Sequence, residues 1–127
     1  RRQRQMCIRD RKMIMETDAF TSFTDPRKFC CHAGVVPFVY VSGSSQRSKN
    51  RVSNRADKSI KHLLHMAALS VSQVKNSPLK KYYDRKVEEG KNKMSVLNAV
   101  RAKLVTIMFA VIRTDAFFSR NYQNSLA

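Results

Sequence analysis

The segment Lys93–Thr114 (KMSVLNAVRAKLVTIMFAVIRT) is the most apolar helical pattern in the chain and decides its fold class. Its apolar residues recur at three- and four-residue spacing, as on one face of an α-helix. Arg101, Lys103 and Arg113 are spaced along its polar side, where their aliphatic stems can lie over apolar neighbours. We expect this helix to be the most buried element of a mainly all-α domain. Its predicted core side carries Met94, Leu97, Val100, Leu104, Ile107, Met108, Val111 and Ile112.

A second amphipathic pattern predicts a helix from about Ala56 to Val74, which would pack against the first. Its apolar stripe consists of Ile60, Leu63, Leu64, Ala67, Ala68 and Val71. Ser53 or Asn54 is expected to cap its N-terminus. Off the stripe lie Lys58, Lys61, His62 and His65. The two histidines are most simply solvated or edge residues, because no carboxylate or cysteine stands at a spacing that would orient them for catalysis.

A third helix is predicted to begin at Ser77, the cap, with Pro78 at its first position and Gly90 at its end. It would turn Leu79, Tyr82, Tyr83 and Val87 inward. Either tyrosine could be a recombinase nucleophile in principle. Both lie in helical register with the apolar residues and lack a surrounding Arg-His-Arg set, so the packing interpretation is preferred.

A short helix is predicted from Asp25-Pro26 to Ala33, with Gly34 as a left-handed stop. Before it, the end of an earlier helix near residues 12–17 leads into a turn that inserts Phe20 and Phe23 into the core. Cys30, Cys31 and His32 match neither a disulfide framework nor a paired C-x-x-C site, so no metal site is predicted. Residues 35–41 are expected to be extended, because Pro37 interrupts their β-branched run.

The segment Val41–Arg55 (VSGSSQRSKNRVSNR) is the part of the sequence best suited to chemistry. Three serines surround Gly43, where the backbone can bend and carry a hydroxyl outward. Four cations follow without an acid before Asp57: Arg47, Lys49, Arg51 and Arg55. A hydroxyl beside fixed positive charge suits attack on a phosphodiester, because the cations stabilise the charge on the phosphate oxygens. We therefore predict a nucleic-acid site here, to which Lys58 and Lys61 of the next helix also contribute.

Composition supports a polyanionic partner. The chain of 127 residues has 25 Lys and Arg against 9 Asp and Glu, a net charge of +16. Nucleic acid is preferred to a membrane surface because the cations cluster in loops and on polar helix faces. No run of eighteen apolar residues and no signal-peptide pattern is seen, so a cytoplasmic location is expected.

Three parts of the chain are expected. Residues 1–11 show no apolar period, and Met6–Asp10 looks like a translated sequencing adapter, so this segment is interpreted as an artefact or as disordered. The helical domain would occupy residues 12–114, and residues 115–127 form a tail without a clear period. Without residues 1–11, 20 basic and 8 acidic residues remain, so the argument from charge is unchanged.

Five blocks, in order and spacing, resemble the C-terminal domain of insertion-sequence transposases of the 110/116/902 group. They are FTDPRKF at 23–29, AGVVP at 33–37, Ser42-Gly43, RVSNRA at 51–56 and LLHMAA at 63–68. The resemblance covers about residues 13 to 114. It implies a DNA recombinase that works with an element-encoded guide (bridge) RNA and links covalently to DNA through a serine, which here is Ser42.

The resemblance carries further expectations. It implies a helix-hairpin-helix-like N-terminal part, whose first limb is not recognisable here, and a short extended segment that carries the serine. The family's nuclease-like half, with metal-binding carboxylates and an expected Mg²⁺, has no counterpart in this chain. The fragment is therefore expected to be inactive alone, to hold no cofactor itself, and to belong to a full-length protein that forms a homo-oligomer on DNA near the bacterial nucleoid.

Two other functions share part of this sequence pattern. A non-catalytic basic module that binds RNA or DNA would show the same charge, and a serine-glycine-serine loop often serves turn geometry alone. A membrane-surface protein that uses the last helix is disfavoured, because that helix is apolar almost all round and has no aromatic anchors at its middle.

Overall fold

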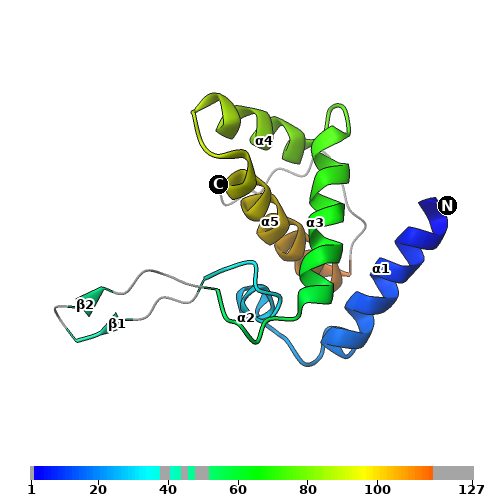
Figure 1. Ribbon diagram of the computed structural model, residues 1–127. Helices are drawn as coiled ribbons and strands as arrows, with labels where there is room; N and C mark the ends of the chain where they lie inside the picture. Colours follow the sequence, from blue (N-terminus) through cyan, green and yellow to red (C-terminus); the bar gives the residue numbers. More distant parts are fainter. Residues whose placement is uncertain (1, 38–40, 44–45, 48–51, 116–127) are drawn as a thin grey trace.

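The structure, a computed structural model, describes residues 2–37, 41–43, 46–47 and 52–115, and describes the backbone alone for residues 2–7, 41–42 and 46–47. These residues form five helices and one short antiparallel pair of strands (Figure 1). The elements are α1 (Arg2–Thr17), α2 (Pro26–His32), β1 (Val41–Ser42), β2 (Gln46–Arg47), α3 (Lys58–Gln73), α4 (Pro78–Glu88) and α5 (Lys93–Thr114). The predicted, mainly helical fold is confirmed.

Helix α5 is central because α2, α3 and α4 all pack against it. Side chains at both of its ends enter a core. Toward its C-terminal end, Val105 and Phe109 join the larger apolar cluster, which also contains Met13, Phe29, Cys30, Ala33, Val35, Ile60 and Leu64. Toward its N-terminal end, Leu97 and Val100 form a smaller cluster with Ala68, against which Tyr82 and Tyr83 of α4 pack. Burial of these side chains is the main force holding the helices together.

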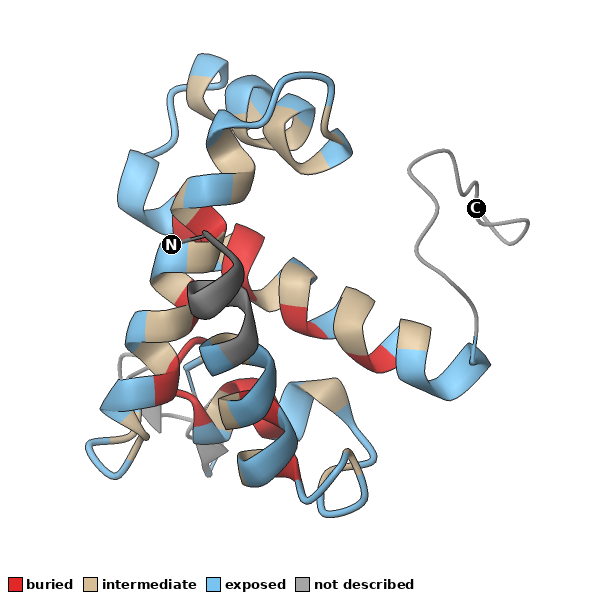
Figure 2. Cartoon of the chain, turned by 90° about the vertical axis from the view of Figure 1, so that its right-hand side faces the viewer, coloured by how far each residue is buried: buried red, intermediate tan, exposed pale blue. Residues whose placement is uncertain are grey.

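The predicted bounds of α5 are confirmed, but part of its predicted core face is wrong. The buried positions are Val96, Leu97, Val100, Arg101, Val105 and Phe109. Met94 is 57% exposed and Ile112 is 52% exposed, although both were expected in the core. Arg101 was expected on the polar side and is only 4% exposed. Buried, half-buried and exposed residues alternate along α5, the helix that leads to the C-terminal trace in Figure 2. Because α5 is apolar on most sides, periodicity could not decide which side α3 would cover.

Helix α2 forms as the sequence predicts. Asp25 Oδ1 accepts a hydrogen bond from the backbone N–H of Arg27 at 2.9 Å, and Pro26 opens the first turn. The helix ends at His32 with Ala33 as its C-cap, and Gly34 follows at φ +70°. Phe29 is fully buried, and the predicted insertion of the preceding turn is seen in edge-on contacts of Phe23 with Phe29 and of Phe20 with Phe109.

Helix α1 extends back to Arg2, so it includes most of residues 1–11, the segment interpreted above as an artefact or as disordered. The adapter origin of that segment stays a prediction. At the other end of α1 the hydroxyl of Thr17, fully buried, donates to Met13 O at 2.6 Å and accepts from Phe20 N at 3.0 Å. These two bonds fix the sharp turn after the helix, in which Asp18, Ala19 and Phe20 all have positive φ.

Helix α3 has a different cap from the one predicted. Asp57 Oδ1 accepts hydrogen bonds from Ser59 N at 2.8 Å and Ile60 N at 3.3 Å, so Asp57 is the cap. Ser53 Oγ instead accepts from Arg55 N at 3.2 Å, which closes a local turn. Of the six residues of the predicted stripe, Ile60, Leu64 and Ala68 are buried, and the other three are half-buried.

Helix α4 begins where predicted, with Ser77 at the cap position and Pro78 first, although the Ser77 side chain makes no cap bond. None of its residues is fully buried, and its two tyrosines are half-buried. Helix α5 is the one helix among the described residues that is long and apolar enough to cross a membrane. Of the 18-residue stretch of α5 that meets this criterion, 33% is buried. Its packing against three helices accounts for part of this composition, as expected for the core helix of a helical bundle.

Candidate nucleic-acid interface

The arm, defined here as β1, Gly43 and β2, is the element that carries the predicted nucleophile. Val41 pairs with Arg47 and Ser42 pairs with Gln46 in antiparallel register. Gly43, at φ +73°, lies directly after Ser42 where the chain turns back. Figure 1 shows β1 and β2 well away from the helices. The Ser42 backbone therefore lies near the turn of a projecting arm, and its side chain lies outside what the structure describes.

The segments leading into and out of the arm lie against each other beside α2 and α3. A Cβ atom built on Gly34 would come 2.5 Å from Ala56 Cβ and 3.2 Å from Val52 Cγ1. Next to this contact, Asp57 N donates to His32 O at 3.1 Å. The absence of a side chain at Gly34 allows this approach, which fixes where the arm leaves the helices.

The basic cluster, defined here as Arg55, Lys58 and Lys61, lies at the start of α3, where the chain returns from the arm to the helices. Arg55 and Lys58 are exposed and Lys61 is half-buried. The Cδ of Lys61 is 3.8 Å from the Cβ built on Gly34, so its aliphatic stem covers the contact between the two segments. Arg47 belongs to β2, while Lys49 and Arg51 lie outside the described residues. The structure thus brings three of the six predicted cations together and places a fourth by its backbone.

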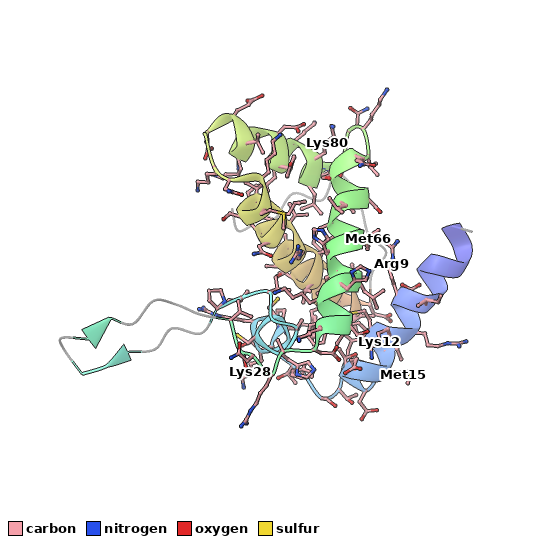
Figure 3. The ribbon with its side chains drawn as sticks, in the orientation of Figure 1. Arg9, Lys12, Met15, Lys28, Met66 and Lys80 are labelled. Carbon is pink, nitrogen blue, oxygen red and sulfur yellow. The ribbon has the colours of Figure 1, made fainter. Side chains whose placement is uncertain are left out.

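Two further cations at this end of the molecule were missed by the sequence analysis. Arg27 and Lys28 are exposed in the first turn of α2, and with Asp25, Cys31 and His32 they line an open hollow of about 390 Å³. Figure 3 shows Lys28 on the side of α2 that faces away from α4. Cations are unfavourable in the first turn of a helix because of the helix dipole. That signal was available in the sequence.

Several lysines at the α4 end of the molecule contact acids or an aromatic ring. Ion pairs join Lys80 to Asp84 and Lys86 to Glu89, at 4.0 and 2.7 Å. The ammonium of Lys103 lies 4.6 Å from the centre of the Tyr82 ring. By contrast, none of the described ion pairs involves a cation of the basic cluster or of the first turn of α2. At the α4 end, Lys75, Lys91 and Lys93 also take part in none of these described pairs, so exposed cations without a described acid partner lie at both ends of the molecule.

His65 and Arg101 form a contact that the sequence did not predict. Nη2 of Arg101 contacts Nδ1 of His65 between α3 and α5, and Arg101 Nε, which is buried, has no partner among the described residues. Burial, the Arg101 charge and the His62 charge lower the pKa of His65, and burial lowers the pKa of Arg101. His65 therefore acts as a hydrogen-bond acceptor for a buried cation.

The cysteines and the nearby acids complete the inventory of reactive groups. Burial raises the pKa of the Cys30 thiol to about 11, so it is a core side chain and a poor ligand or nucleophile. His32, considered with the cysteines in the sequence, lies instead beside Glu16, with Nε2 3.9 Å from Oε2. Among the described residues, Glu16, His32 and Asp57 form the one group whose ligand atoms could hold a metal ion, all within 4.8 Å of one another.

Comparison with known proteins places this sequence in a family. Over 100 residues, 79% of this chain, it is 29% identical to the pilin gene-inverting proteins of Moraxella lacunata and Moraxella bovis. The chain spans 31% of the length of each of these relatives. Residues 8–84 match the family described as Transposase IS116/IS110/IS902 family, a range that includes the arm and the basic cluster. More than half of the sequence lies in this match, and the chain therefore belongs to the IS116/IS110/IS902 transposase family.

Proposed function

We propose that this chain is the part of a transposase that holds DNA, together with a guide RNA, and supplies Ser42 as the nucleophile for strand exchange during movement of an insertion sequence. One observation supports the proposal most. The arm that carries Ser42 leaves the helices beside the start of α3, where none of the cations of the basic cluster takes part in a described ion pair. The family membership supports recombination as the reaction class.

The cations would act by positioning and by charge. Arg55, Lys58 and Lys61 lie where a phosphodiester backbone running alongside α3 would meet all three. Arg47, Lys49 and Arg51 follow Ser42 in sequence and would offset charge on the phosphate under attack. Arg27 and Lys28 on α2 would supply two further exposed cations.

The proposed reaction at Ser42 is a phosphoryl transfer. The Ser42 oxygen forms a bond to a DNA phosphorus, the bond from that phosphorus to a deoxyribose oxygen breaks, and the departing DNA hydroxyl takes up a proton. The resulting phosphoserine bond conserves the energy for the reverse step, in which a second DNA hydroxyl displaces the serine. A serine hydroxyl is a weak nucleophile, so its activation would need a base or Mg²⁺ held by the nuclease-like half.

The remaining proposals follow from the family. The full-length protein would act as a homo-oligomer on DNA at the bacterial nucleoid, in the cytoplasm, and the chain alone would be inactive. Helix α1, its turn and α2 would correspond to the helix-hairpin-helix-like part.

A covalent intermediate tests the proposal directly. A full-length relative is incubated with labelled DNA and resolved on a denaturing gel, with the residue equivalent to Ser42 changed to Ala. We expect the protein–DNA adduct to disappear, while Ser53→Ala, a serine used in a local turn, leaves it in place. An adduct that persists without the Ser42 hydroxyl would rule out this nucleophile.

The second candidate is a non-catalytic module that binds RNA or DNA through the same cations. The observation in its favour is that the basic cluster and Arg27 and Lys28 form a basic surface without any catalytic group among the described residues. It predicts nucleic-acid binding by this chain and no covalent adduct in the full-length protein.

A further inference from the structure

We infer that Glu16, His32 and Asp57 form a binding site for a divalent transition-metal ion such as Zn²⁺. The three residues come from three separate elements: the last turn of α1, the end of α2 and the cap of α3. Their ligand atoms lie within 4.8 Å of one another. One imidazole and two carboxylates are the ligand types that zinc accepts.

The distances suit an ion after small adjustments of the side chains. Zinc binds imidazole nitrogen and carboxylate oxygen at about 2.0–2.2 Å, so tetrahedral ligand atoms lie roughly 3.4 Å apart. His32 Nε2 and Glu16 Oε2 are 3.9 Å apart, which needs a contraction of about half an ångström. Asp57 uses Oδ1 for the α3 cap, so its Oδ2 is the oxygen left for an ion.

A cation already lies beside these carboxylates. The ammonium of Lys12 is 2.6 Å from Glu16 Oε1, and its hydrogen bond to Glu16, together with the negative charges of Glu16 and Asp57, raises the pKa of Lys12. The cluster therefore attracts positive charge in a protein that is otherwise strongly basic. Glu16 keeps Oε2, the oxygen on the His32 side, outside this ion pair. Lys12 would compete with a metal ion for the negative charge of Glu16 and Asp57.

An ion could reach the cluster from solvent. The side chains of Glu16 and His32 are 25% and 40% exposed, and His32 also lines the open hollow on α2. A hollow that opens onto one ligand supplies the entry path that a metal site needs. Water could complete the coordination, as in zinc sites with three protein ligands.

Binding at this position would connect α1, α2 and α3 beside the point where the arm leaves the helices. Asp57 directly follows Ala56, which contacts Gly34, and its backbone N–H bonds to His32 O. An ion would therefore stabilise the folded state and fix the base of the arm, because the three ligands come together only on folding.

The test uses the full 127-residue chain after removal of bound metal. Isothermal titration with Zn²⁺ should show one site, and the thermal midpoint should rise when the ion is added. Each of Glu16→Gln, His32→Gln and Asp57→Asn should weaken binding about tenfold or more. Asp57→Asn keeps a side-chain oxygen for the cap, so loss of binding would not reflect loss of α3.

Two variants sharpen the result. Lys12→Met removes the competing ammonium and should tighten binding about threefold or more, the range of an exposed ion pair. His62→Gln changes an exposed histidine outside the cluster and should leave binding unchanged. Urea unfolding of every variant without metal checks that each one folds.

Cobalt distinguishes this site from the cysteines. Co²⁺ bound by nitrogen and oxygen lacks the thiolate charge-transfer bands that cysteine ligation would give. Absence of stoichiometric zinc binding, thiolate bands with Co²⁺, unchanged affinity in the three ligand variants, or weaker binding in Lys12→Met would each overturn the inference.

Discussion

Gly34 is the residue on which the position of the arm depends most. It has φ +70°, and a Cβ there would come 2.5 Å from Ala56 Cβ, so substitution adds both backbone strain and a steric clash. We expect Gly34→Ala to lower the free energy of unfolding by about 2–4 kcal/mol.

Gly90 supplies the matched control. It also has a positive φ, +83°, but a Cβ there meets nothing within 4 Å. Gly90→Ala should cost about 1 kcal/mol, the backbone strain alone. Urea unfolding measures both variants, and equal losses would mean that the close approach at Gly34 does not contribute.

The titration of His65 should make the free energy of unfolding depend on pH. Its pKa is lowered from the ordinary value of 6.5 by burial, Arg101 and His62, so the unfolded chain binds the proton more readily than the folded one. As the pH falls through 6.5, the free energy of unfolding should therefore decrease, and the loss should level off below the folded pKa.

His65→Gln tests this reading, since an amide oxygen can still accept from Arg101 but does not titrate. The difference in free energy of unfolding between about pH 7.5 and about pH 5 should be smaller in the variant than in the unchanged protein. An identical pH dependence in both proteins would show that His65 is not the responsible group.

At the scale of elements, two residues can be compared as the N-cap of α3. The structure assigns the cap to Asp57, so Asp57→Ala should lower the free energy of unfolding by about 1 kcal/mol. Ser53→Ala, at the position that the sequence favoured, removes one exposed local bond and should change stability by less than about 0.5 kcal/mol. Chemical denaturation of both variants checks this, and the reverse order of effects would favour the cap that the sequence predicted.

Local sequence signals predicted these elements well. Asp25-Pro26 and Ser77-Pro78 each marked the beginning of a helix, and Gly34 marked the end of one. The cap of α3 was missed because Ser53, Asn54 and Asp57 are all good caps. The choice among them depends on where the chain leaves the contact with Gly34.

Contacts between residues far apart in the chain could not be predicted from the spacing of apolar residues. Arg101 is buried because α3 covers that side of α5 and His65 accepts from its guanidinium, a contact between residues 36 positions apart. In the same way, Glu16, His32 and Asp57 come together only through the packing of three helices. Ser42 and its neighbouring cations could be proposed from the order of motifs, while Arg27 and Lys28 were missed although their place in the first turn of a predicted helix was visible in the sequence.

At the scale of the whole molecule, exposed cations lie at both ends. No described ion pair involves the basic cluster or the first turn of α2. At the α4 end, described acids pair with Lys80, Arg85 and Lys86, while Lys75, Lys91 and Lys93 take part in no described pair. Charge alone therefore does not separate the two ends, and we expect a polyanion to be held at the arm end because the basic cluster lies where the chain leaves the helices toward Ser42.

The measurement that tests this most directly compares DNA binding by two variants that lose the same charge. One is Arg55→Gln/Lys58→Gln/Lys61→Gln, and the other changes three exposed lysines near α4: Lys75→Gln/Lys91→Gln/Lys93→Gln. Binding of labelled DNA by this chain is measured over a series of salt concentrations. We expect the first variant to lose about tenfold or more in affinity, with a salt dependence shallower by about 3 in log–log slope, while the second stays close to the unchanged protein. Equal losses in the two variants, or a larger loss in the second, would contradict this expectation.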